Sequence, residues 1–134
     1  MMPRISEDQF AKITKPREKR TRKPDTRPLE KDVQAAVKSY LHRLGALPIR
    51  VNSGAMTAEH NERKRFIRFT SEPGCSDIIV CLDGYFIAVE CKRVGEVATA
   101  AQLAFGKKVQ DAGGVFLVVS SVDQLREGLK AVGL

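Results

Sequence analysis

The stretch that decides the fold is GCSDIIVCLDGYFIAVECKR, residues 74–93. Two runs rich in β-branched, aromatic and other apolar residues flank Asp83 and Gly84. An Asp-Gly pair between such runs is a strong signal for a β-hairpin closed by a two-residue type I′ turn. Counting outward from this turn pairs Asp77 with Glu90. The sequence therefore predicts that two carboxylates meet at the open end of a hairpin.

Opposite residues of a hairpin share one face of the sheet, with Cβ atoms about 4.5–5.5 Å apart. Lys92 lies two residues beyond Glu90 and belongs to the same face, whereas Cys91 belongs to the other face, which we expect to be buried. Like charges placed opposite each other destabilise the pair, and a divalent cation would offset that cost. Mg²⁺ or Mn²⁺ suits this role, since such hard cations prefer carboxylate oxygens and substrate phosphate. Asp77 and Glu90, with Lys92 beside them, are therefore a candidate metal site.

A simpler interpretation makes Lys92 a salt-bridge partner of Glu90 at a solvated sheet end. Such surface pairs are common and contribute only about 0–1 kcal/mol. The Glu-x-Lys pattern alone favours this interpretation. The register with Asp77, the position of Glu30 described next and the basic composition together favour the metal site.

The first helix begins near Pro28 and ends at Gly45. Its apolar residues recur at helical spacing: Leu29, Val33, Val37, Tyr40, Leu41 and Leu44. Glu30 falls within this apolar stripe on a helical wheel. An inward carboxylate requires a partner, although a favourable interaction with the helix dipole in the first turn would also explain it. Both explanations stay open.

Between this helix and the hairpin, the alternation over Leu47–Val51 predicts a short strand, which Pro48 assigns to the margin of a sheet. Residues 53–70 are either an irregular loop or include a strand over Arg65–Thr70 with a basic outer face; we favour the strand. Its arginines and lysines are also suited to gripping a phosphate backbone, and the two interpretations are compatible.

After the hairpin, Thr99 and Gln102 form a capping box for a helix that runs to about Ala112. The apolar run Val115–Ser120 predicts a buried strand, and Ser121 begins a last helix. The resulting order is α-β-β-β-α-β-α. Since a strand–helix–strand succession usually makes a right-handed parallel crossover, the sheet should be mixed and the class α/β.

A length of 134 residues fits one domain, and 43% hydrophobic residues allow one modest core. The formal charge of +7 favours a polyanionic partner, nucleic acid above all. Residues 1–28 are rich in Lys, Arg and Pro and poor in apolar residues, which predicts a flexible basic arm before a domain over residues 29–134. That arm is either a solvated tail or a segment that adds sequence-independent affinity for phosphates.

The three cysteines, Cys75, Cys81 and Cys91, are expected to be reduced thiols in a cytoplasmic protein. No secretory leader is expected over the N-terminal residues, and no run approaches about 18 apolar residues, so no membrane association is expected. A zinc site is not expected either, because there is no Cys-x-x-Cys pair and His42 and His60 lack the spacing of metal ligands.

The ordered set of Glu30, Gly74-Cys-Ser-Asp77 and Glu90-Cys-Lys92 resembles the PD-(D/E)XK nuclease superfamily. The Arg-Val-Asn-Ser-Gly run over residues 50–54 and the later Gln102 are similar to its VRR-NUC branch. The resemblance covers about residues 29–134. Cys75-Ser76 stands where proline commonly precedes the aspartate, a change that removes no ligand.

The resemblance implies a restriction-endonuclease-like αβββαβ core, with a mixed central sheet flanked by helices, and an active site that binds Mg²⁺ or Mn²⁺. It assigns metal ligation to Asp77, Glu90, the Cys91 backbone carbonyl and Glu30 (directly or through water), the catalytic lysine to Lys92, and an active-site role to Gln102. From the residues alone, Gln102 is explained equally by its helix cap.

Stand-alone members of this branch, of viral and bacterial type, look like homodimers that act on branched DNA such as four-way (Holliday) junctions or flaps. The expected activity is therefore a metal-dependent, structure-selective endodeoxyribonuclease. Two alternatives stay open: a non-catalytic DNA-binding module on a nuclease-like fold, and a nuclease directed at RNA.

Overall fold

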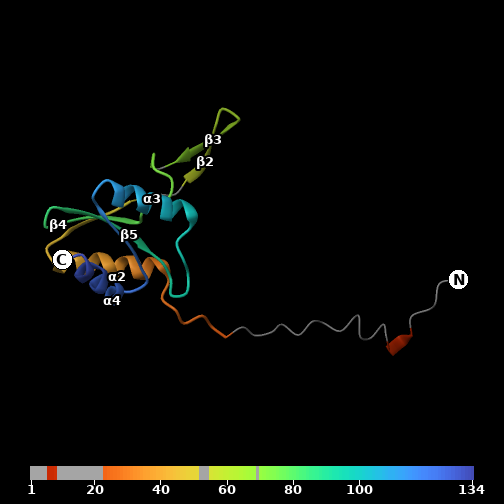
Figure 1. The fold of residues 1–134 in the computed structure, drawn as a ribbon. Helices are drawn as coiled ribbons and strands as arrows, with labels where there is room; N and C mark the ends of the chain where they lie inside the picture. Colours follow the sequence, from red (N-terminus) through yellow and green to blue (C-terminus); the bar gives the residue numbers. More distant parts are fainter. Residues whose placement is uncertain (1–5, 9–22, 52–54, 69) are drawn as a thin grey trace.

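The computed structural model describes residues 6–8, 23–51, 55–68 and 70–134. Figure 1 shows the arrangement of the helices and strands. In chain order these are α2 (Glu30–Arg43), β1 (Leu47–Arg50), β2 (Ala55–His60), β3 (Arg63–Arg68), β4 (Ile78–Leu82), β5 (Tyr85–Cys91), α3 (Ala100–Asp111), β6 (Val115–Val119) and α4 (Val122–Ala131). The predicted αβββαβα order is confirmed, with one additional hairpin, β2–β3, between β1 and β4.

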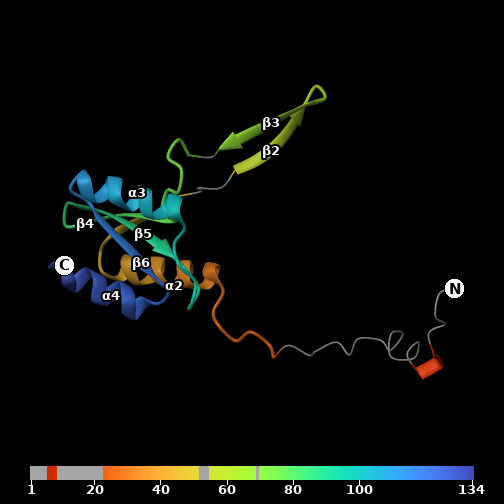
Figure 2. The ribbon, with the colours of Figure 1, turned by 45° about the vertical axis from the view of Figure 1, so that its right-hand side comes forward.

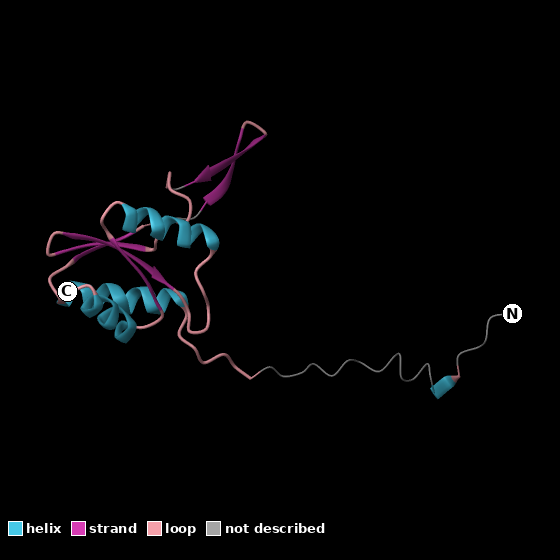
Figure 3. Cartoon of the chain, viewed as in Figure 1, coloured by secondary structure: helices cyan, strands magenta, loops and turns pink. Residues whose placement is uncertain are grey.

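A four-stranded sheet in the order β1-β4-β5-β6 forms the centre of the molecule. Strand β4 pairs antiparallel with β1 on one side and with β5 on the other, whereas β5 and β6 are parallel. Helix α3 covers one face of this sheet, and helices α2 and α4 cover the other (Figure 3). The predicted mixed sheet and α/β class are therefore confirmed.

The β4–β5 hairpin has the predicted register, from Leu82 opposite Tyr85 to Ile78 opposite Val89. Its turn residue Asp83 has a φ of 49°, and Gly84 has a φ of 79°. Two consecutive positive φ angles are what a type I′ turn requires. The Asp-Gly signal thus identified both the turn and the pairing.

Strand β5 is buried on both faces because it lies inside the sheet and between the helical layers. On the α2 and α4 side, its residues Ile87, Val89 and Cys91 are fully buried in the larger apolar cluster. On the α3 side, Ala88 packs with Phe105 and Val109 in a smaller cluster. None of the described helices is long and apolar enough to cross a membrane.

The two edge strands are less buried than the centre. Pro48 on β1 points into the core while Leu47 and Ile49 are exposed, which fits the predicted place of this strand at the sheet margin. The prediction that the run after α3 is a buried strand is wrong in part, because β6 is the opposite edge and Val118 is 39% exposed. An apolar run does not distinguish a central strand from an edge strand covered by two helices.

Strands β2 and β3 pair only with each other and form a separate two-stranded sheet. The preferred interpretation of this segment, a basic strand, is correct in kind, but the strand covers Arg63–Arg68 and has a partner that we did not predict. Figure 2 shows the hairpin projecting from the body, away from the four-stranded sheet. Its turn residues Asn61 and Glu62 have φ angles of 51° and 61°.

Candidate active site

The carboxylate of Asp77 is held at the end of β5. Continuing the β4–β5 register by one step places Asp77 opposite Glu90, as predicted. The Cys91 backbone N–H donates to Asp77 Oδ2 at 2.9 Å. The Asp77 carbonyl accepts from the Val51 N–H at 2.8 Å, which ties it to the chain leaving β1. The backbone of Asp77 is therefore tied to the chain leaving β1, and its carboxylate is tied to the end of β5.

Glu90 is a buried carboxyl group with one unsatisfied oxygen. Its side chain is 1% exposed, and Oε1 accepts from Gln102 Nε2 at 2.8 Å. Oε2 is buried and has no hydrogen-bond partner in the described part of the chain. Burial raises the pKa of Glu90 to about 8, and the negative charge of Asp77 acts in the same direction, while the positive charge of Lys92 opposes them. Ionised Glu90 consequently requires a cation.

Gln102 makes the helix-cap contacts and also donates a hydrogen bond to Glu90. Its Oε1 accepts from the Thr99 N–H at 2.8 Å, and its own N–H donates to Thr99 Oγ1 at 3.2 Å, which completes the predicted capping box of α3. The remaining amide nitrogen, Nε2, donates to Glu90. One side chain therefore fixes the start of α3 and orients the buried carboxyl.

Gly74 brings the segment before Asp77 against the start of α3. Its φ is +71°, and a Cβ at this position would overlap the backbone carbonyl of Ala101 in the first turn of the helix. Only glycine permits both the positive φ and this approach. The contact holds the segment that leads into Asp77 against the first turn of α3, which carries Gln102, although the two are far apart in sequence.

Lys92 is on the predicted face and is buried, with 9% of its surface exposed. In the described part of the chain it forms no salt bridge with Glu90 or any other residue. Neither member of the Glu-x-Lys pair is solvated, so the surface-pair interpretation does not describe them. A buried ammonium without an ion-pair partner is suited to bind an incoming anion.

Glu30 reaches the same region from another element. It is the first residue of α2 and is half-buried. Its negative charge contributes to the raised pKa of Glu90. The pKa of Cys91 is raised to about 12, first by burial, then by the charges of Asp77 and Glu90, and least by that of Glu30. Glu30 therefore lies near the carboxylate pair, consistent with the predicted inward position.

The described residues contain no group of three or more His, Cys, Asp or Glu side chains placed to hold a metal ion. The site thus offers Asp77 and Glu90 as a pair, with Glu30 further out. Such a pair suffices for Mg²⁺, which keeps several waters and is usually bound by one or two carboxylates plus substrate phosphates.

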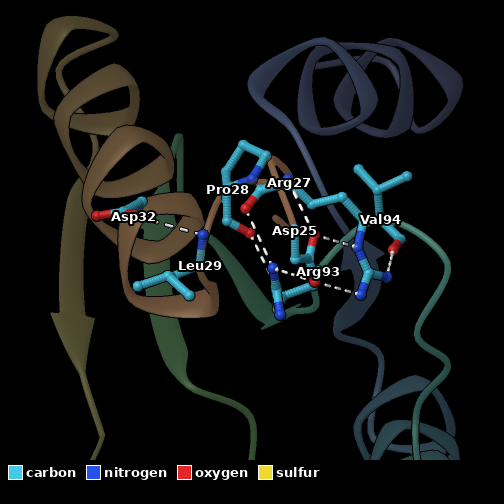
Figure 4. A network of polar contacts seen from close by, with 7 residues as sticks. All are labelled: Asp25, Arg27, Pro28, Leu29, Asp32, Arg93 and Val94. Atoms are coloured by element: carbon cyan, nitrogen blue, oxygen red, sulfur yellow. Dashed lines mark hydrogen bonds and ion pairs between the residues drawn. The ribbon is translucent and has the colours of Figure 1, made fainter. Parts of the chain in front are cut away.

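A polar network that we did not predict lies next to Lys92. Arg93 forms an ion pair with Asp25 at 2.9 Å and donates to the backbone carbonyls of Arg27 and Pro28, both at 3.1 Å. Arg27 donates in turn to the Val94 carbonyl at 2.7 Å and pairs with Asp25, whose pKa the hydrogen bonds from Arg27 hold well below its usual value. We call this network of Asp25, Arg27, Pro28, Arg93 and Val94 the Arg93 clasp (Figure 4).

The clasp ties the chain before α2 to the end of β5. It thereby connects the residue that follows Lys92 to the segment that leads into Glu30. Within the predicted basic arm, residues 1–5 and 9–22 lie outside the described residues, whereas Asp25 to Pro28 contact the body through this network. Isolated charged residues near prolines gave no signal of such a contact.

Arg93→Gln should loosen the start of α2. The substitution removes the ion pair with Asp25 and the paired donors to two carbonyls, so amide exchange at Arg27 is expected to become roughly tenfold faster. Hydrogen exchange followed by mass spectrometry or NMR measures this. Lys107→Gln, which breaks the exposed pair with Asp111, is the control. Equal exchange in both variants would show that the clasp does not hold this segment.

Compared with known proteins, the sequence matches no protein-family model and no curated protein.

Proposed function

We propose that this protein is a Mg²⁺- or Mn²⁺-dependent nuclease that hydrolyses phosphodiester bonds in DNA. The observation that carries the proposal is half-buried Asp77 beside buried Glu90, whose Oε2 has no hydrogen-bond partner among the described residues. Buried Lys92 shares their face of the sheet and forms no salt bridge in the described part of the chain. The mixed sheet flanked by helices agrees with the restriction-endonuclease-like core that the resemblance to the VRR-NUC branch implies. That resemblance also makes branched DNA the first substrate class to test.

The residues present fit a divalent cation. Glu90 Oε2 is an orphaned acceptor, and two facing carboxylates are unfavourable without a positive charge between them. Asp77 and Glu90 would hold the ion, with the Cys91 carbonyl from the end of β5, and Glu30 would contribute through water. When bound, Mg²⁺ or Mn²⁺ lowers the pKa of a coordinated water and neutralises charge that develops on the phosphoryl oxygens.

The side chains of this protein have separate tasks in that reaction. As an ammonium, Lys92 would orient the attacking water and stabilise negative charge on the phosphorus centre. Only as a neutral amine could it also accept the proton of that water. Gln102 fixes the orientation of Glu90, and the Cys91 N–H fixes that of Asp77. Both hydrogen bonds restrict the carboxylates before substrate arrives, and preorganisation of this kind is a major source of catalytic power.

The proposal is tested by incubating the protein with labelled four-way junctions, flaps, linear duplex and single-stranded DNA, and duplex RNA. Cleavage should occur in Mg²⁺ or Mn²⁺ and stop in EDTA, and the ranking of substrates gives the preferred structure. A protein that binds these nucleic acids tightly without metal and cuts none of them would instead be the DNA-binding module.

Asp77→Asn separates these functions further. In a nuclease it removes a metal ligand, so cleavage should fall by a factor on the order of 10² or more. Affinity for DNA in EDTA should stay the same or increase, because one charge that repels phosphate is lost. Electrophoretic mobility shift in EDTA and cleavage in Mg²⁺ are measured on the same preparation. Unchanged cleavage would remove Asp77 from the site.

A further inference from the structure

The β2–β3 hairpin lacks what normally stabilises a sheet of its size. Two strands alone are marginally stable in water, and a hydrophobic face packed on a helix or on further strands is usually needed. Here Ile67 is 41% exposed, and the pair of strands joins no other sheet in the described part of the chain. A projecting ribbon of this kind presents surface for a partner rather than packing against the core.

The charge of the hairpin indicates the kind of partner. Its sequence contains Arg63, Lys64, Arg65 and Arg68 against the acids Glu59 and Glu62. The side chains of Arg63, Lys64 and Arg65 are exposed and form no ion pair in the described part of the chain. Together with Asn61 they line a hollow of about 570 Å³ near the turn. Although Glu59 lies opposite Lys64 in the β2–β3 register, the four cations outnumber the two acids, and a hollow lined by cations is suited to receive anionic groups such as phosphates.

The cations occupy both faces of the ribbon. Since side chains alternate along a strand, Arg63 and Arg65 share one face and Lys64 shares the other with Phe66. A flat anionic surface, such as a membrane, meets only one face of a ribbon. A nucleic-acid groove is bounded by two phosphate strands and can meet both faces, and the major groove, about 12 Å wide, admits a two-stranded ribbon.

The root of the hairpin lies beside the candidate active site. The chain leaves the body at Val51, whose N–H donates to the Asp77 carbonyl at 2.8 Å, and it returns through Gly74, which packs against α3. At about 3.3 Å per residue, each six-residue strand is roughly 20 Å long. A duplex held along the hairpin would therefore continue toward Asp77.

We propose that the β2–β3 hairpin is a duplex-binding arm, in which Arg63, Lys64 and Arg65 contact the phosphates of a nucleic-acid duplex outside the site of cleavage. The arm adds affinity that does not depend on base sequence, because contacts to phosphate carry no sequence information. This inference deepens the proposed nuclease function by assigning the element that holds the substrate, but duplex binding itself requires no cleavage.

The test compares two variants with equal losses of charge. One replaces Arg63, Lys64 and Arg65 by alanine. The matched control replaces Lys38, Arg43 and Lys130, which are exposed on α2 and α4, by alanine. Binding to a fluorescein-labelled linear duplex is measured in EDTA by anisotropy over a range of salt concentrations. Thermal unfolding of both variants checks that the body stays folded, as expected for exposed residues.

The hairpin variant should lose affinity roughly tenfold or more at low salt, and the slope of log K against log salt should decrease by about two to three, close to 0.9 for each lost phosphate contact. The control should retain most of the slope. Equal slopes in the two variants would overturn the inference, and so would a loss seen only with single-stranded DNA or with anionic vesicles.

The outcome is separate from that of the nuclease proposal. If the wild type cuts no substrate in Mg²⁺ but its duplex affinity depends on the hairpin, the duplex-binding role of the hairpin is correct and the proposed nuclease activity is wrong. If the wild type cuts and both triple variants bind duplex equally, the proposed nuclease activity is correct and the duplex-binding role of the hairpin is wrong.

Discussion

Lys92→Ala should abolish cleavage, lowering the rate at saturating DNA by a factor on the order of 10²–10⁴, the usual contribution of a positioned acid–base group. The buried ammonium makes no salt bridge in the described part of the chain, and Glu90, whose pKa its charge lowers, can take up a proton when that charge is removed. The loss should therefore appear in the chemical step and not in folding. Single-turnover cleavage measures the rate, and binding in Ca²⁺ measures affinity.

Two further substitutions define what Lys92 does. Lys92→Arg keeps the positive charge but provides a group that does not give up its proton, so it should restore activity only if charge alone is required. Lys107→Ala removes an exposed lysine of α3 and should leave the rate unchanged. Full activity in Lys92→Ala would exclude the proposed site, whatever the result for the other two variants.

Glu90→Gln should stabilise the protein at pH 8 in EDTA while it abolishes cleavage. The pKa of Glu90 is raised from 4.5 to about 8 in the folded protein. The folded state consequently holds a proton that the unfolded state releases over this interval, and wild-type stability falls as pH rises through it. Each pKa unit corresponds to about 1.4 kcal/mol, so even half of this pKa shift lowers the free energy of unfolding by about 2 kcal/mol at pH 8. Gln removes this cost.

Denaturant unfolding at several pH values checks this expectation. Between pH 4.5 and pH 8 in EDTA, the wild type should lose stability, while Glu90→Gln should not show this component. Glu127→Gln, an exposed carboxyl on α4, is the control and should follow the wild type. Added Mg²⁺ should reverse the order of stability, because only the wild type gains binding energy from the ion. The same pH dependence in Glu90→Gln and wild type would show that burial of ionised Glu90 does not lower the stability of the protein.

Much of the core and of the candidate site was predictable because local signals agreed with the tertiary structure. Asp83-Gly84 defined the hairpin register, and this register placed Asp77 opposite Glu90. Thr99 and Gln102 defined the start of α3. These signals depend on backbone geometry over a few residues, which explains why a single sequence was sufficient.

Other features depended on contacts that no local pattern encodes. Strand β2 was missed because Ala55–His60 contains residues common in helices and its turn, Asn61-Glu62, lacks the usual glycine. The Arg93 clasp joins residues more than sixty positions apart. The burial of Glu90 also depends on how α3 packs, so periodicity could place its carboxyl on a face but could not show that the face is covered.

The double role of Gln102 limits how this sequence can change. A capping box accepts Glu as readily as Gln at this position. Glu, however, has no N–H to donate to Glu90 and would add a third negative charge beside a pair that already lacks compensation. Insertion of one residue before position 102 would turn its side chain by about 100° around the helix and away from β5. The sheet beneath α3 therefore limits both which residue can occupy position 102 and where along the helix that residue can lie.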